Sequence, residues 1–133
     1  MDEVTVRVEA EVNPTEDEAK VKVAVANLLG DVPTITRPSG VGSVLTAEAK
    51  GREALENLRN LLRRDRIRTA ARKVLFKSLR GNAIGFFLNK QVAFAGHVSF
   101  SQEAGESPLG PIKVVIKCEN PRELIDWLAP AAP

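Results

Sequence analysis

A strict alternation of apolar and polar residues near the start of the chain most constrains what the chain can fold into. Every second position from Val4 to Val12 is apolar, and the residues between them are Thr5, Arg7, Glu9 and Glu11. A period of two with β-branched side chains predicts a β-strand with one buried face. That face needs a layer of other elements over it, so we expect a sheet that is covered on one side.

Two helical patterns follow this strand. Thr15 and Glu18 form a capping box, and the apolar stripe behind them ends at Gly30, which predicts a helix between these points. Leucines at helical spacing then occur after Gly51 and continue to Leu62. This spacing predicts a second helix in the middle of the chain.

A third helical pattern is separated from the second by a kink near Arg64 and Asp65. It runs to Leu79 and stops at Gly81. We expect its buried side to consist of Ile67, Ala70, Ala71, Val74 and Leu75. A short final helix opens at Asn120, with proline at its first position.

The remaining segments predict strands and turns. A short strand is expected at 43–49, and alternation returns at 84–88, 97–100 and 112–118, with His97 and Ser99 outward. Asn89 closes one of these strands and caps a short helix. Residues 31–43 are punctuated by proline and glycine, which favours a loop or irregular edge. The short links between the late strands favour an antiparallel sheet with helices packed on one face, an α+β fold.

Size and composition are those of one soluble domain. We expect residues 1–133 to form a single domain with a frayed tail at 129–133. No apolar run approaches the roughly 20 residues that span a bilayer, and the charged N-terminus is not a signal peptide, so we expect a cytoplasmic protein without a membrane partner. The single cysteine, Cys118, excludes an internal disulfide and any multi-cysteine metal site.

Several sequence blocks resemble a family of uncharacterised small archaeal proteins. They are VEAEVNPTEDEAKV at 8–21, RIRTAARKVL at 66–75, FFLNKQVAFAGHVSF at 86–100, ESPLGPIKVVI at 106–116 and DWLAP at 126–130. The resemblance implies an archaeal source and a five-stranded antiparallel sheet with helices. It also implies a fold related to the ribosomal protein that binds 5S rRNA, an RNA-recognition-type fold. Fold likeness by itself does not establish a function.

Positive charge is concentrated in one segment. Nine of the 19 Lys and Arg residues lie between Arg59 and Arg80 with a single acid, although the net charge of the chain is only +2. Within the basic stretch 63–80, one arc of a helix would present Arg66, Lys73, Lys77 and Arg80 over about 21 Å. Such a row suits the phosphates of RNA.

The same row also has a structural interpretation. An amphipathic helix needs a solvated face, and the acidic remainder of the chain can neutralise its cations. The acids considered for this role are Glu9, Glu11, Glu16 and Asp17. We expect the row to be largely paired with such acids.

The outward face of the predicted sheet is a poor platform for RNA bases. It offers one aromatic, Phe87, together with Glu9 and Glu11, which repel phosphate. Gly85, Phe87 and Val115 on this face suit contact with a second copy of the chain.

Catalytic and ligand-binding motifs are weak. His97 is the single histidine, and Ser99 follows it two residues along without an evident base-orienting partner, so a catalytic triad is not indicated. Lys90 and Gln91 can bind an anion, but strand closure by Asn89 explains this cluster more simply. We expect Cys118 in the core and Trp127 as the anchor of the final helix, with no cofactor and no metal.

Three hypotheses remain open. The first is a non-enzymatic small domain that acts through protein contacts as a homodimer. The second is an RNA-binding accessory protein that uses the basic helix at 63–80. The third, and weakest, is a small-ligand or catalytic role near Lys90 and His97.

Overall fold

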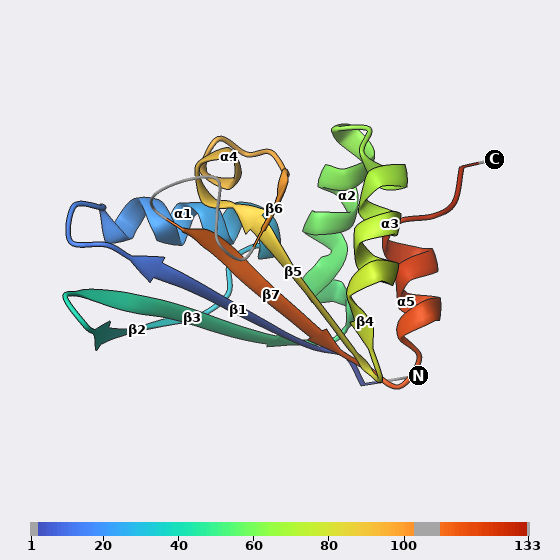
Figure 1. Ribbon diagram of the computed structural model, residues 1–133, viewed down its shortest axis with the longest axis horizontal. Coiled ribbons are helices and arrows are strands. Elements are labelled where there is room, and N and C mark those ends of the chain that lie inside the picture. Colours follow the sequence, from blue (N-terminus) through green and yellow to red (C-terminus); the bar gives the residue numbers. More distant parts are fainter. Residues whose placement is uncertain (1–2, 103–109, 133) are drawn as a thin grey trace.

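The computed structural model describes residues 3–102 and 110–132, and its centre is an antiparallel sheet (Figure 1). The order of neighbouring strands is β2-β3-β1-β7-β5-β4, and β6 pairs with β5 beside this path. The strands are β1 (Thr5–Val12), β2 (Thr34–Ser39), β3 (Gly42–Lys50), β4 (Leu79–Arg80), β5 (Ala83–Asn89), β6 (Phe100–Ser101) and β7 (Pro111–Lys117).

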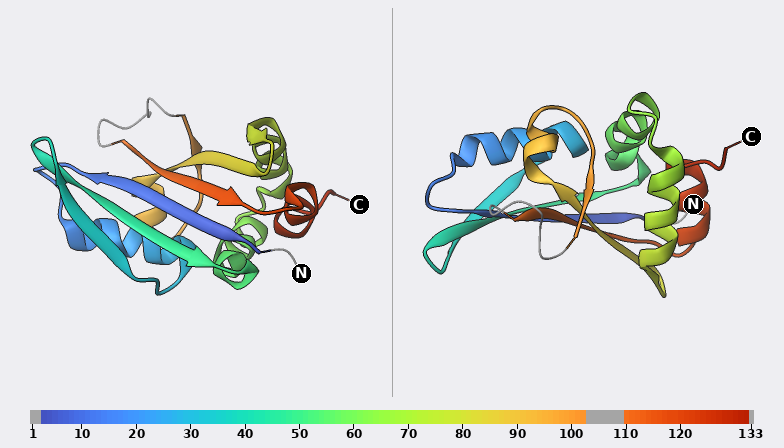
Figure 2. Two further views of the ribbon diagram at one scale, coloured as in Figure 1. Left: turned by 90° about the horizontal axis from the view of Figure 1, so that it is seen from below. Right: turned by 45° about the horizontal axis from the view of Figure 1, so that its top comes forward.

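Helices cover one face of this sheet and leave the other open (Figure 2). They are α1 (Glu18–Leu29), α2 (Glu56–Arg64), which follows the 3₁₀ turn η1 (Arg52–Leu55), α3 (Arg68–Ser78), α4 (Lys90–Phe94) and α5 (Pro121–Leu128). The alternation in β1 works as expected, because Val6 and Val8 are buried while Arg7 and Glu9 are exposed. The α+β class with an antiparallel sheet and helices is therefore confirmed.

The expected number of five strands is wrong, because residues 3–102 and 110–132 already form a sheet of seven strands. The segment expected to be a loop or irregular edge forms β2, which pairs with β3 at the border of the sheet. An edge strand tolerates Pro38 because its missing N–H is not needed by a second neighbour. The other additional strands, β4 and β6, have two residues each and are too short to show alternation.

The α1 terminus also differs from the expected one. Asp17, and not Thr15, caps α1, with its Oδ1 accepting from the backbone N–H of Ala19 at 2.9 Å. The reciprocal contact before the helix is made by Glu16, whose Oε1 accepts from the backbone N–H and the side-chain amide of Asn13. The capping-box pattern thus located the helix but placed its first residue too early.

The kink predicted near Arg64 and Asp65 is confirmed as a full break between α2 and α3. Arg66 lies in this break with φ of 58°, which ends the first helix and reverses the chain. The prediction that Ala70 is buried is wrong, because α3 rests on the sheet through Ala71 and Leu75. The helix ends at Ser78 because the next two residues join the sheet as β4.

The segment 97–100, expected to be a strand with His97 on its outward side, is a strand only at its last residue. Asn89 caps α4, as expected, by accepting from the N–H of Val92 at 2.9 Å. The chain then passes through a turn that contains His97 and rejoins the sheet only at Phe100. No helix within the described ranges is long and apolar enough to cross a membrane.

Candidate nucleic-acid interface

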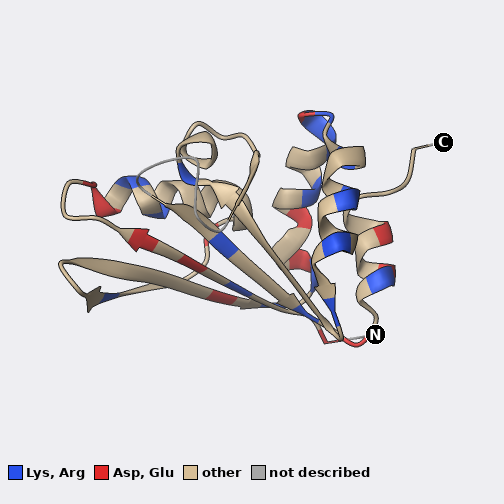
Figure 3. Cartoon of the chain, viewed as in Figure 1, with Lys and Arg blue, Asp and Glu red and all other residues tan. Residues whose placement is uncertain are grey.

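Lys73 and Lys77 stand exposed on α3, one helical turn apart, and Arg80 follows them in β4. Figure 3 shows the basic residues along this part of the chain in blue. None of the three, nor Arg66, has a carboxylate oxygen of the described residues within 4.0 Å. Like charges at this spacing repel each other, so they do not stabilise the helix. A bare row of cations is what an interface for a polyanion requires.

The expectation that the protein's own acids neutralise this row is therefore wrong for the described part of the chain. Glu16 pairs with Lys90, and Asp17 is used as the cap of α1. Glu9 and Glu11 lie on the open face of the sheet in β1. The sequence contains these acids, but it does not show that the fold places them away from α3.

Arg80 is held in position by the end of α3. Its Nη1 donates to the carbonyl oxygens of Lys77 at 3.0 Å and Leu79 at 2.8 Å. These carbonyls at the helix C-terminus have no partner further along the helix, and a cation is favourable there. The guanidinium is thus oriented before any ligand arrives, and it has further donors to offer.

Arg66 does not lie on the same helix as the lysines, contrary to the helical arrangement expected for 63–80. It occupies the tip of the α2–α3 hairpin, and its neighbour Asp65 fixes this tip. Asp65 accepts from the backbone N–H of Val98 at 3.1 Å and from Arg64 Nε at 3.2 Å, and it lies 3.2 Å from His97 Nδ1.

These contacts also set the acidity of Asp65. Burial by itself would raise the pKa of its carboxyl group, but the hydrogen bonds from His97, Val98 and Arg64 outweigh burial and hold the pKa below the ordinary 3.8. The carboxylate is therefore charged when the protein is folded, and His97 belongs to a structural clamp.

Two other arginines of the helical layer, Arg59 and Arg72, are occupied by structural contacts. Arg59 donates from Nε to the carbonyl oxygen of Trp127 at 2.9 Å, and its guanidinium lies 5.1 Å from the indole ring. Arg72 forms an ion pair with Asp126 at 2.7 Å and also bonds to the carbonyl oxygen of Ala129. These residues attach α5 to α2 and α3, and the expectation that Trp127 anchors the final helix is confirmed.

The middle of the open face contains the three residues expected to form a dimer contact. Gly85 pairs with Val115, and Phe87 pairs with Lys113, and all three predicted residues are half-buried. Phe87 is the one aromatic residue whose position in the strand register directs it to this face. The face therefore lacks the neighbouring aromatics on which unpaired bases stack.

Lys90 lies in a different environment from the other lysines, because only 3% of it is exposed. Its Nζ donates to the carbonyl oxygen of Glu11 at 2.6 Å and forms an ion pair with Glu16 at 2.9 Å. A shallow pocket of about 300 Å³ lies beside this pair, lined also by Gln91 and Phe94. The ammonium group is committed to the protein's own oxygens, a role that the sequence did not reveal.

Burial alone would raise the pKa of Glu16. The hydrogen bonds from Asn13 and Lys90 outweigh burial and hold the pKa below the ordinary 4.5.

Cys118 is buried in the core, as expected. In the described ranges, no three His, Cys, Asp or Glu residues gather in a way that could hold a metal ion.

These features define an α+β protein with an uncovered cationic row at one end of its helical layer. The model of a family described as "RNA binding" matches residues 5–118. A UPF0201 protein of Sulfurisphaera tokodaii is 47% identical over 123 residues, which cover 92% of this chain and 85% of that protein. A UPF0201 protein of Pyrobaculum calidifontis is 47% identical over 127 residues, covering 93% and 89%.

A solved structure agrees with these sequence relatives. The crystal structure of a UPF0201 protein from Methanococcus jannaschii superimposes with a TM-score of 0.86 at 32% identity, covering 97% of this chain and 95% of that one. The chain therefore belongs to this archaeal family of uncharacterised proteins, and the resemblance seen in its sequence blocks is confirmed. Likeness to the ribosomal protein that binds 5S rRNA stays a prediction.

Proposed function

We propose that this protein is a cytoplasmic, non-enzymatic accessory protein that binds RNA through the row formed by Lys73, Lys77 and Arg80, with Arg66 at the hairpin tip. The single observation that carries the proposal is that these cations are exposed and have no carboxylate partner in the described part of the chain. The family model described as "RNA binding" supports it.

The contrast within the helical layer strengthens the proposal. Arg59 and Arg72 are engaged by backbone carbonyls, an acid and aromatic rings, so they have a structural purpose. Lys73 and Lys77 have no such contact with the described residues, and their removal should not weaken the fold. Cations that cost electrostatic repulsion and contribute no internal bond are most simply explained by a ligand.

The proposal is tested with a fluorescent structured RNA and anisotropy titrations from 20 to 300 mM salt. The triple variant Lys73→Gln, Lys77→Gln and Arg80→Gln should lower the slope of log K against log salt by about 2 to 3, since each phosphate contact contributes about 0.7 to 0.9. A charge-matched control removes Lys20, Lys22 and Arg37, which are exposed and lie away from the row. Thermal unfolding verifies that both variants remain folded.

Two results would refute this assignment. One is the absence of measurable binding by the wild-type protein at the lowest salt. The other is an equal loss in the control variant, which would mean that net charge alone, and not the row, attracts the RNA.

We also propose self-association as a second function, because Gly85, Phe87 and Val115 lie together on the open face. A glycine opposite Val115 leaves room for a side chain of another copy. Sedimentation velocity of the wild type and of Phe87→Asp tests this idea. A wild-type protein that is monomeric at high micromolar concentration would rule it out.

A further inference from the structure

A second set of cations lies on the open face of the sheet and meets the α3 row at Arg80. Following the strand register, Arg80 pairs with Ala83, Ala83 with Lys117, Lys117 with Thr5, and Thr5 with Lys50. Three of these five residues are basic, and none is acidic. With neighbouring strands about 4.8 Å apart, this cross-strand row extends about 19 Å.

The other rows of the open face carry no such excess. The next row contains Arg7 and Glu48, which form an ion pair at 3.7 Å. The row after it sets Lys113 beside Glu9. The two acids that argued against an RNA site on this face, Glu9 and Glu11, thus lie toward the far end of β1. The basic row is bordered on its outer side by Glu3 and Glu119, just beyond β1 and β7.

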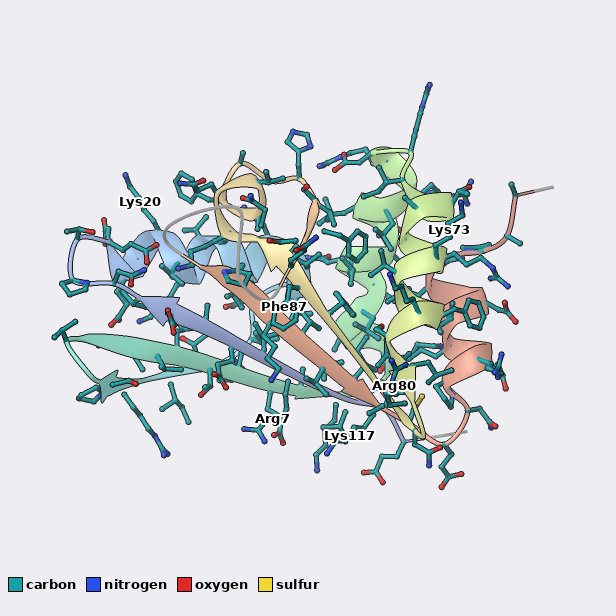
Figure 4. The ribbon with its side chains drawn as sticks, in the orientation of Figure 1. Arg7, Lys20, Lys73, Arg80, Phe87 and Lys117 are labelled. Carbon is teal, nitrogen blue, oxygen red and sulfur yellow. The ribbon has the colours of Figure 1, made fainter. Side chains whose placement is uncertain are left out.

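The β4–β5 hairpin, residues 79–84, forms a projecting corner (Figure 2). The row on α3 lies on one side of this corner and the cross-strand row on the other. Gly81 and Asn82 are exposed at its tip, and Gly81 has φ of 59°, which suits glycine in a tight turn. Figure 4 shows Lys73 on the helical side of this corner, while Arg7 and Lys117 project from the open face of the sheet. The corner is therefore a narrow convex edge with cations on both flanks.

The aromatic residues show which kind of nucleic acid this edge does not suit. Binding of single strands relies on aromatic side chains against which bases stack. The chain has five Phe, one Trp and no Tyr. Phe86 and Phe100 pack together, Phe87 is half-buried in the sheet, and arginine guanidinium groups lie over Phe76 and Trp127. Phe94 is exposed and lies beside Lys20 of α1. No pair of them forms a stacking surface beside the corner.

We propose that the ligand of the RNA site proposed above is double-helical RNA, and that the hairpin corner enters one of its grooves. A groove is lined by phosphates of both strands, so a convex edge with cations on both flanks is complementary to it. Lys73 and Lys77 contact the phosphates of one strand, and Lys117 and Lys50 contact those of the other. Arg80 is at the point where both sets meet.

Thr5 adds a feature suited to RNA. Its side chain stands between Lys117 and Lys50 in the row and carries a hydroxyl group that can donate and accept. The 2′-hydroxyl is the group that distinguishes RNA from DNA, and duplex RNA is recognised mainly by shape and by contacts to phosphates and 2′-hydroxyls. The inference rests on the proposed RNA binding and names the kind of RNA that is bound.

The test compares three probes of equal length: an RNA duplex of 20 base pairs, one of its single strands, and the DNA duplex of the same sequence. We expect the RNA duplex to bind at least tenfold more tightly than the single strand and more tightly than the DNA. Counting the five cations on the two flanks of the corner and leaving aside Arg66 at the other end of α3, affinity for a duplex should fall about 500-fold between 50 and 200 mM salt. For Lys50→Gln with Lys117→Gln, the fall should be only about 40-fold.

Two further variants locate the contact. Asn82→Asp places a negative charge at the tip and should weaken duplex binding at least fivefold, while Lys20→Gln with Lys22→Gln should leave it unchanged. Thr5→Val should reduce the preference for RNA over DNA.

The outcomes separate the two proposals. If the Lys73, Lys77 and Arg80 variant loses binding but the Lys50 and Lys117 variant does not, the RNA-binding site stands and the groove contact is refuted. Equal or tighter binding of the single strand refutes the duplex assignment. If no probe binds at low salt, the proposed function itself fails.

Discussion

The ion pair between Lys90 and Glu16, whose side chains are almost fully covered, predicts a large stability effect. The exposed fractions of the two side chains are 4% and 9%, and Lys90 Nζ also bonds to the carbonyl oxygen of Glu11. Replacing Lys90 by Met keeps most of the volume and removes the charge. Glu16 is then left buried without its cation, and the Glu11 carbonyl without its donor.

The size of this effect follows from the environment. Removing one partner of a buried pair costs about 3 to 5 kcal/mol, because the remaining charge is poorly solvated. For a domain of this size, with a urea m-value of about 2 kcal/mol/M, the midpoint of unfolding should fall by about 1.5 to 2.5 M. The exposed pair between Lys22 and Glu18 provides a matched control, and Lys22→Met should cost less than about 0.5 kcal/mol.

A double variant distinguishes this explanation from a simple packing defect. Adding Glu16→Gln to Lys90→Met removes the isolated charge and should recover part of the lost stability at pH 7. The pKa of Glu16 is lowered in the folded protein, so its contribution is present above pH 4.5 and fades as the pH falls below that value. If Lys90→Met unfolded at the wild-type midpoint, or if the double variant were less stable still, the ion pair would not be the stabilising element.

Three smaller effects are expected from other sites. Asp65→Asn should lower stability by about 1 to 2 kcal/mol at pH 7 through weaker bonds to Val98 and the rest of the clamp. Because the pKa of Asp65 is lowered, this deficit should shrink as an acid titration passes below pH 3.8. Gly42→Ala should destabilise by about 1 to 3 kcal/mol, measured by urea unfolding, since the new methyl group collides with the carbonyl oxygen of Val12. Arg66→Gly relieves a positive φ and should raise the melting temperature by a few degrees in calorimetry, and an unchanged or lower value would contradict the strain.

Local patterns predicted the elements of this fold but not its edges. The alternation from Val4 to Val12 and the break near Asp65 are encoded by neighbouring residues, and both are present in the structure. The strand β2 contains Pro38 and alternates poorly, because an edge strand needs only one partner and hides little surface. Strands of two residues, such as β4, are created by tertiary pairing and leave no periodic signal.

In the candidate site, too, the sequence predicted what one element determines and missed what depends on several. Lys73 and Lys77 were identifiable because they share one helix face. Their pairing state was not, since it depends on where the acids of other elements lie. Lys50 and Lys117 are 67 positions apart in the sequence and come together with Arg80 only through the register of five strands. A charge count along the chain therefore finds the first half of the basic surface and misses the second.

The positions of arginine and lysine distinguish cations that hold the fold together from cations that are exposed to a ligand. Arg59 and Arg72 each bond to a carbonyl oxygen while lying against an aromatic ring, a combination that suits the planar guanidinium, which can stack on a ring and donate in its own plane. At Lys73 and Lys117, where the structure shows exposed side chains, the residue is the mobile, strongly hydrated point charge. Such a charge follows a phosphate backbone without demanding one geometry, which suits recognition of a duplex by shape and not by base sequence. Arg59 and Arg72 thus hold the helices together, lysines form most of the surface proposed to face the ligand, and Arg80 takes part in both roles.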